Sequence, residues 1–368
     1  MLFDRRAILK AGTALAFAAE LPTRARADVS FDPRPGTWRT FRVVTRLEID
    51  MPVGVTQAWI PLPSINQDAW IKALGNTWTG NGEATLMRDP QYGAEMLHVT
   101  WGTKEEAPVV EVASTISTQD RAIDLTRPGD PSITLGDAER SFNTAGTELI
   151  PVDGIVKAAS DKITAGATTE VDKVRAIYEW IVDNTFRDAK VRGCGVGDIA
   201  AMLQTGNLGG KCADLNALFV GLVRSAGIPA RDIYGVRVAP SKFGYKALGA
   251  NSEVITKAQH CRAEVFLAGY GWVATDPADV RKVVLEEPPT NLAVGDPKVV
   301  AARKTLFGAC EGNWLAYNFA HDVALPGSSG PKIGFLMYPQ GETAGVRLDS
   351  LDADNFKYVI TAKELGAA

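Results

Sequence analysis

Histidine and cysteine are scarce: the 368 residues include three of the former and four of the latter. The cysteines form no Cys-x-x-Cys pair and the histidines show no metal-ligand spacing, so we do not expect a structural zinc site. No segment is a block of positive charge, which argues against nucleic acid or an anionic membrane surface as the main partner. No cofactor motif is recognisable, and we expect no cofactor.

Long apolar runs are also absent. The apolar stretch from Ala11 to Ala19 is too short to span a bilayer, which takes about 20 residues. It lies between the pair Arg5-Arg6 and the small-x-small motif Ala25-Arg26-Ala27. This order predicts a twin-arginine export signal over residues 1–27, and a periplasmic or secreted protein whose mature chain has no integral membrane segment. The alternative is a cytoplasmic protein with a basic N-terminal tail.

The bulk composition is ordinary for a globular protein, with 46% hydrophobic and 22% charged residues, enough for a sizeable core. The length suggests two or three domains. Five Lys or Arg and two Asp or Glu lie in residues 1–27, so the mature chain would keep 34 and 41, a formal charge of −7. An acidic mature surface allows a protein or peptide substrate without selecting one.

Residues 28–150 are predicted to form an N-terminal β domain and a connector. β-Branched and charged residues nearly alternate in three segments, 40–49, 96–101 and 109–116, with turns rich in Gly, Asn and Pro between them. Several short strands with such turns are typical of a β-sandwich-like domain.

The pattern changes after residue 150, where helices precede strands. Residues 171–184 carry apolar residues at helical spacing without Gly or Pro, and a second helix should run from Cys212 to Ala226. Strands are expected at 231–238, 262–267 and 272–276. Helices followed by antiparallel strands predict an α+β core over residues 151–290, and residues 291–368 are expected to form a short β-rich C-terminal extension.

Cys212 stands at the start of the second helix, directly after Gly209-Gly210-Lys211. Two glycines allow a sharp turn into the helix, and the helix dipole favours the thiolate form of a thiol in the first turn. The N–H of Cys212 is one of the free donors of a helix start, so it is suited to form half of an oxyanion hole. The alternative is a small buried cysteine that packs a helix start.

His260 and Asp276 lie on the strands that follow, 48 residues after Cys212 and 16 further on. An Asp beside the histidine strand can hold the imidazole in the tautomer that takes a thiol proton. A hairpin with the loop Gly269-Tyr270-Gly271 would place Asp276 opposite Glu264, so a bulge or strand offset is needed. The alternatives are an ordinary strand-edge histidine and a turn aspartate.

Other residues compete for these roles. Asp279 is a second candidate for the orienting acid. His321 is a rival base beside an aspartate, but neighbours on a strand face opposite sides, and His98 is expected to be structural. By the same alternation Cys261 should point away from the cleft that His260 faces, as a buried or disulfide-bonded residue.

Together these segments resemble the transglutaminase-like superfamily, whose core has a papain-like cysteine-protease fold. The resemblance covers about residues 165 to 285, and four motifs carry it: Gly210-Lys211-Cys212 with its helix, Arg224-Ser225-Ala226-Gly227-Ile228-Pro229-Ala230-Arg231, His260 followed by Glu264, and Gly271-Trp272-x-x-x-Asp276-Pro277. It implies that Cys212 is the nucleophile, His260 the general base and Asp276 the orienting acid. The whole mature chain is similar to exported bacterial members of the family.

The resemblance implies attack of a thiolate on an amide carbonyl and a thioester that water or an amine resolves. We favour hydrolysis of peptide or isopeptide bonds in a protein or peptide substrate, because water is the abundant acceptor. Cross-linking acyl transfer is the alternative within this chemistry. A non-catalytic module that binds a peptide or an envelope component, and a redox protein with Cys212 in a disulfide, are alternatives of other classes.

Two details of the site stay open in the sequence. Gln204, eight residues before the nucleophile, and Trp180 are loose candidates for the second oxyanion donor. One disulfide is possible in an oxidising compartment, and spacing does not determine the pairing among Cys194, Cys261 and Cys310.

Overall fold

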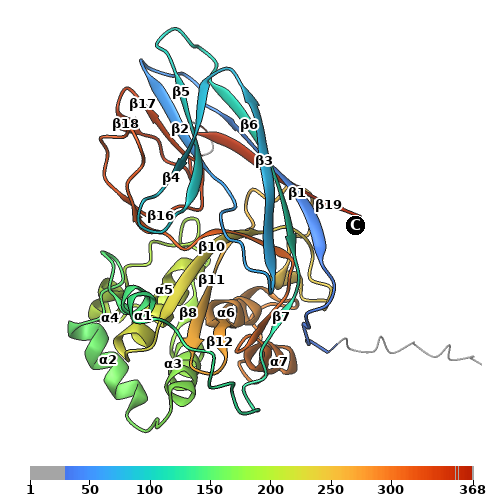
Figure 1. The fold of residues 1–368 in the computed structure, drawn as a ribbon, viewed down its shortest axis with the longest axis vertical. Helices are drawn as coiled ribbons and strands as arrows, with labels where there is room; N and C mark the ends of the chain where they lie inside the picture. The colour runs from blue at the N-terminus through green and yellow to red at the C-terminus, as the bar shows by residue number, and fades with distance from the viewer. Residues whose placement is uncertain (1–29, 353, 355, 367–368) are drawn as a thin grey trace, which may run out of the picture.

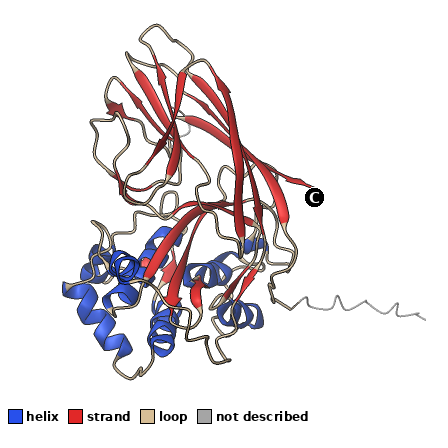
Figure 2. Cartoon of the chain, viewed as in Figure 1, coloured by secondary structure: helices blue, strands red, loops and turns tan. Residues whose placement is uncertain are grey.

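The computed structural model describes residues 30–352, 354 and 356–366. The predicted export signal, residues 1–27, lies outside the described residues. Figure 1 shows long strands at one end of the molecule and a helix-rich half at the other, and Figure 2 shows the helices gathered in that half. Among the described residues, no helix is both long and apolar enough to cross a bilayer.

Two antiparallel sheets form the strand-rich half, a β-sandwich (Figure 1). The first sheet has the order β19 (Lys357–Leu365), β1 (Arg39–Glu48), β6 (Val109–Thr118), β3 (Ile71–Gly80). The second has the order β18 (Val346–Arg347), β17 (Gln340–Thr343), β2 (Thr56–Pro61), β5 (Glu95–Trp101), β4 (Glu83–Arg88). Inward-facing apolar residues fill the layer between them, including Leu47, Ile60, Leu97, Val112 and Phe356. The predicted β-sandwich-like part of the fold is confirmed.

Strands from the two ends of the chain share these sheets. β19 pairs with β1, with Thr45 opposite Ile360, and β17 pairs with β2, with Trp59 opposite Gln340. The domain limits expected from the sequence remain predictions. What the pairings add is that strands after residue 339 lie beside strands before residue 62.

A four-stranded antiparallel sheet and a buried helix form the centre of the helix-rich half. The sheet has the order β12 (Gly271–Thr275), β11 (Gln259–Leu267), β10 (Ala230–Arg237), β14 (Trp314–Asn318). Helix α5 (Cys212–Ser225) packs on β10 and β11, and all its residues are buried. Complete burial explains why its sequence is apolar on nearly every side. The predicted second helix and the α+β class are confirmed.

Further helices enclose α5. α2 (Gly154–Thr164), α3 (Glu170–Asn184) and α6 (Pro277–Glu286) pack against it, and Thr169 caps α3 by accepting the N–H of Asp172. The remaining elements are α1 (Asp137–Thr144), α4 (Ile199–Thr205), α7 (Pro297–Thr305), the 3₁₀ turn η1 (Lys246–Leu248), and the short strands β7 (Arg121–Ala122), β8 (Phe186–Arg187), β9 (Gly209–Gly210), β13 (Ala309–Cys310), β15 (His321–Val323) and β16 (Ile333–Phe335). The sequence analysis missed α6, which begins directly after Asp276.

Candidate active site

Cys212 is the first residue of α5 and lines a cavity of about 680 Å³ together with His260. The chain reaches Cys212 through β9. Gly210 in this strand leaves room for the side chain of Asp214, because a Cβ on Gly210 would lie 2.5 Å from the Cβ of Asp214. The Cys212 side chain is 3% exposed, so the thiol opens only into the cavity. Its N–H has no hydrogen-bond partner in the described part of the chain.

Asp214 ties the loop before α4 to the start of α5. Its carboxylate accepts the N–H groups of Val196, Gly197 and Lys211, each at 2.9 Å. The loop comes so close that a Cβ on Gly195, whose φ is +96°, would lie 1.8 Å from the Asp214 Oδ2. The sequence analysis did not assign Asp214 a role; its place in the first turn of the helix was the available signal.

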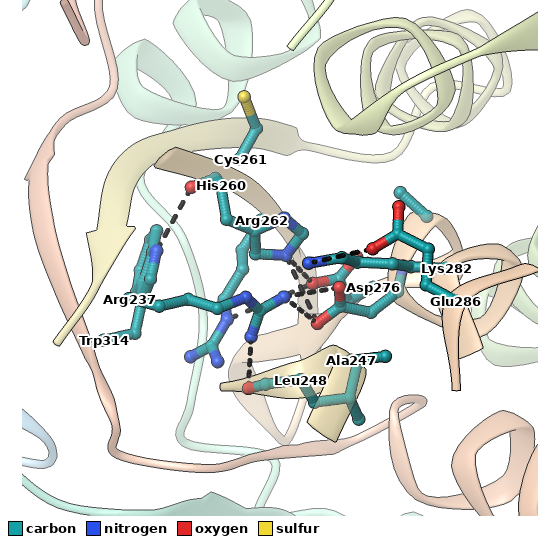
Figure 3. Close-up of polar contacts among 12 residues, drawn as sticks. Arg237, Ala247, Leu248, His260, Cys261, Arg262, Asp276, Lys282, Glu286 and Trp314 are labelled. Carbon is teal, nitrogen blue, oxygen red and sulfur yellow. Dashed lines mark hydrogen bonds and ion pairs between the residues drawn. The ribbon is translucent and has the colours of Figure 1, made fainter. Parts of the chain in front are cut away.

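This loop brings a second thiol to the site. The Sγ atoms of Cys194, Cys212 and Cys261 all lie within 4.8 Å of one another. The Cys194 thiol donates to the Gln259 carbonyl at 3.4 Å, and all cysteines in the chain are free and buried. Figure 3 shows Cys261 pointing away from the His260 contacts, as strand alternation predicts. The sequence did not reveal that α5 packs on that side and places Cys212 beside it.

Among the three thiols, Cys212 is the one whose neighbours favour the thiolate. Hydrogen-bonding contact with Cys194 and Cys261, and the positive charge of His260, hold the pKa of Cys212 well below its ordinary value although burial opposes this. The same contact with Cys212 raises the pKa of Cys194, and burial raises the pKa of Cys261. One thiolate with two thiol neighbours is therefore the expected state near neutral pH.

Two carboxylates hold the His260 side chain, which lies on the side of β11 opposite Cys261 (Figure 3). Its Nε2 lies 2.7 Å from Asp276 Oδ2 and 3.3 Å from Asp279 Oδ2. Arg237 in turn donates to both oxygens of Asp279, at 2.5 and 2.7 Å. Because Nε2 is engaged, the imidazole keeps Nδ1 for other partners. Asp276 is thus the carboxylate nearer to Nε2. Asp279, its competitor in the sequence, lies farther away and pairs with Arg237.

Asn216 links the nucleophile helix to this cluster. It is fully buried one turn after Cys212, and its Nδ2 donates to Asp276 Oδ1 at 3.1 Å and to the Cys261 carbonyl at 2.9 Å. The same Asp276 Oδ1 also accepts the Asp279 N–H at 3.0 Å. The sequence analysis missed Asn216, although a polar residue four positions after the candidate nucleophile on an apolar helix was a usable signal.

The protonation states follow from these neighbours. Burial and Arg237 lower the pKa of His260, but the charges of Asp279 and Asp276 outweigh them and raise it to about 9. Burial and the charge of Asp279 raise the pKa of Asp276. Burial opposes ionisation of Asp279, yet Arg237 and His260 hold its pKa well below the ordinary value. The site therefore favours an imidazolium beside a thiolate.

The hairpin between the two strands differs from the one considered in the sequence analysis. Glu264 pairs with Ala274 and Leu267 with Gly271, so the loop begins at Ala268. This register leaves Asp276 beyond the last pair of β12, as the N-cap of α6. The required offset arises because the chain leaves the sheet at this residue and turns its side chain towards His260.

The other residues weighed in the sequence lie outside the cavity. His321 is buried 3.3 Å from the Tyr234 hydroxyl, and burial lowers its pKa well below the ordinary value. His98 stacks on Trp59 in the sandwich. Gln204 and Trp180 do not line the cavity. None of these side chains lies beside Cys212 in a position to take its proton.

Three further residues of the sequence motifs have structural contacts. Glu264 is fully buried between Arg121 and Arg231, with its oxygens 2.7 Å from Arg121 Nη1 and 2.7 Å from Arg231 Nε. Arg224 donates to the Ala230 carbonyl at 2.7 Å. These contacts fasten the central sheet to its surroundings rather than face the cavity.

Two clusters in the described residues have enough donors to hold a metal ion: the three thiols, and His260 with Asp276 and Asp279. The second already holds the guanidinium of Arg237 against Asp279, which disfavours another cation there. The thiols are soft donors of the kind that zinc prefers.

Comparison with known proteins gives a family for this fold and site. The family model of the transglutaminase-like superfamily matches residues 157–277, which include Cys212, His260 and Asp276. The chain belongs to the transglutaminase-like superfamily.

Particular relatives extend the similarity beyond that segment. A Haemophilus influenzae protein described as "Uncharacterized protein" is 37% identical over 329 residues, which is 85% of this chain and 87% of the relative. A solved structure of a "Putative Cysteine Protease" from Cytophaga hutchinsonii covers 89% of this chain and 99% of its own, with a TM-score of 0.51 and 13% identity. At that identity the match shows a shared fold. The periplasmic domain of TgpA from Pseudomonas aeruginosa matches 68% of this chain and 90% of its own, with 15% identity and a TM-score of 0.33, too low for inference.

Proposed function

We propose that the protein is a thiol enzyme that cleaves amide bonds, peptide or isopeptide, with Cys212 as nucleophile, His260 as acid and base, and Asp276 as the orienting acid. The observation that carries this proposal is that Cys212, at a helix start, shares a cavity with a histidine whose Nε2 lies 2.7 Å from a buried carboxylate. Membership of the transglutaminase-like superfamily supports it.

The proposed reaction begins with attack of the Cys212 thiolate on an amide carbonyl. Negative charge develops on the carbonyl oxygen, and the N–H of Cys212 is the donor available beside the thiolate. The C–N bond then breaks, the His260 imidazolium protonates the leaving amine, and the acyl group remains as a thioester. Water, deprotonated by His260, attacks the thioester and restores the thiolate.

Hydrolysis is preferred over cross-linking because water reaches any open cavity, whereas acyl transfer requires an amine that competes with it. The two outcomes can be separated by adding a fluorescent primary amine during turnover of a peptide substrate. Incorporation of the label into the acyl product would favour the acyltransferase, and release of a free carboxylate would favour the hydrolase. The free thiols argue against silencing by a disulfide. We further propose that the protein acts outside the cytoplasm, on the strength of its predicted export signal.

Alkylation of Cys212 by iodoacetamide tests the thiolate–imidazolium pair directly. We expect rapid labelling at neutral pH, located by mass spectrometry, that disappears in Cys212→Ala and slows in His260→Ala. His98→Ala is the matched control, because this histidine lies in the sandwich outside the cavity. Slow labelling that is equal in wild type and His260→Ala would contradict the proposal.

A further inference from the structure

The cavity around Cys212 has a charge opposite to that of the chain. The whole sequence has 39 Lys and Arg against 43 Asp and Glu. Among the residues that line the cavity, seven are Lys or Arg and one, Glu48, is acidic. Such a difference between a cavity and its protein indicates selection for the charge of an occupant rather than for solubility alone.

Five of the seven cations are compensated by carboxylates in or beside the cavity wall. The pairs are Arg46 with Glu48 (2.7 Å) and Glu111 (3.9 Å), Arg187 and Lys282 with Glu286 (3.7 Å from Lys282), Arg192 with Asp349 (2.8 Å), and Lys357 with Asp50. Five cations thus face five carboxylates, and their charges cancel to first order. The excess comes from the two lysines that remain, Lys211 and Lys257.

Neither ammonium has an ion pair or hydrogen bond within the described residues. Lys211 immediately precedes Cys212 as the N-cap of α5, and Lys257 lies three residues before His260. The two free cations therefore belong to the two segments that carry the nucleophile and the base. The start of α5 adds its partial positive charge to theirs.

We propose that the cavity selects an acidic peptide, whose carboxylates lie against Lys211 and Lys257 while the amide bond to be cleaved lies at Cys212. This rests on the proposed function, since it assumes that the cavity holds the acyl donor. A peptide with lysine or arginine at the same positions would meet two uncompensated like charges and be rejected. The paired cations contribute little net charge, so the preference for an acidic peptide comes from the two unpaired lysines.

A pair of alkylating probes tests the charge preference without a known substrate. Iodoacetate is anionic and iodoacetamide is neutral, and in both reactions the Cys212 thiolate forms an S–C bond while iodide leaves. We expect the ratio of their rates at Cys212, relative to the same ratio for free cysteine, to exceed one in low salt. In the double variant Lys211→Gln, Lys257→Gln the ratio should fall about three- to fivefold, as expected for the loss of two charges that line the same cavity as the thiolate.

Several controls keep the outcomes distinct. Lys332→Gln removes an exposed lysine outside the cavity and should leave the ratio unchanged. The iodoacetamide rate alone reports the thiolate, so slow labelling by iodoacetamide would contradict the proposed function. A ratio that is equal in the wild type and the double variant would overturn only the charge selection.

Peptides provide a second arm. Triglutamate should slow the iodoacetamide labelling of wild-type Cys212 more than trilysine does at the same concentration, and this difference should vanish in the double variant. Equal protection by the two peptides in the wild type, or stronger protection by trilysine, would overturn the proposal of an acidic peptide.

Discussion

Two protons decide the chemistry that we propose for the cavity: one must leave Cys212 and one must stay on His260. The first is favoured by two thiol neighbours and a helix start, and the second by two carboxylates. In the sequence, the glycine turn and the helix start made Cys212 a candidate nucleophile, with a packing cysteine as the alternative. Asp276 and Asp279, which raise the pKa of His260, were candidates in the sequence, whereas Cys194 reaches Cys212 through a loop that no local pattern predicted.

The His260 pKa of about 9 predicts the alkaline limit of activity. Because the leaving amine takes its proton from the imidazolium, kcat/KM should fall as the pH rises through about 9. Asp276→Asn removes a negative charge and should move this limb to lower pH by about one unit. The measurement is the pH profile of peptide cleavage. Asp198→Asn is the matched control, since Asp198 also caps a helix, and an equal shift in both variants would count against the assignment.

Cys194 should tune the nucleophile without replacing it. Its contact is the first cause of the lowered Cys212 pKa, so Cys194→Ala should raise that pKa and slow alkylation of Cys212 below neutral pH. Rates measured from pH 5 to 9 give the pKa directly. Cys310→Ala removes a buried thiol outside the three-thiol cluster and should leave the profile in place. An unchanged profile in Cys194→Ala would contradict the role given to this thiol.

At the scale of elements, periodicity and turn chemistry predicted the two main helices, but not how the strands meet. The helix from Cys212 was predicted because apolar residues continue to the stop at Gly227, whereas the hairpin after His260 was placed with a different loop. The strand β12 ends where α6 begins, at Asp276 and Pro277, and α6 packs against α3, α5 and α7. An aspartate followed by proline is a helix-start signal, so α6 could have been predicted from the sequence.

The loop that carries Cys194 contains Gly195, a position with no room for a side chain. Gly195→Ala should destabilise the protein by more than Gly206→Ala, although both glycines have positive φ. At Gly206 nothing lies within 4 Å of the added Cβ, so only the left-handed backbone costs energy, about 1–2 kcal/mol. At Gly195 the Cβ also overlaps Asp214. Thermal unfolding of the two variants is the measurement, and equal melting temperatures would contradict the tight contact.

For the whole molecule, the cavity joins the two halves. Its wall includes Arg46 and Lys357 from the sandwich as well as Cys212 and His260 from the helix-rich half. The sequence divided the chain into consecutive parts, because a linear pattern shows where elements begin and end but not which distant strands pair. The sandwich is completed by residues that had been expected to form a C-terminal extension.

Removing β19 should therefore damage the sandwich as well as the cavity. Deletion of residues 357–368 takes away the buried Ile360 and the ladder that covers one edge of β1, and should lower the free energy of unfolding by about 2 kcal/mol or more. Deletion of residues 366–368 keeps the strand and should have little effect. Chemical denaturation measures both, and similar midpoints for the two truncations would refute the prediction.

The pairing of β1 with β19 also fixes a sequence of events during synthesis. β1 leaves the ribosome before the other described strands and β19 leaves after them, yet the two strands lie side by side. A nascent chain can pair β1 with β6, but the other edge of β1 stays uncovered until β19 has left the exit tunnel, since residues inside the tunnel cannot join a sheet. Closure of this edge is thus a late step of folding, and the nascent protein presents an open strand edge until residues 357–365 are free.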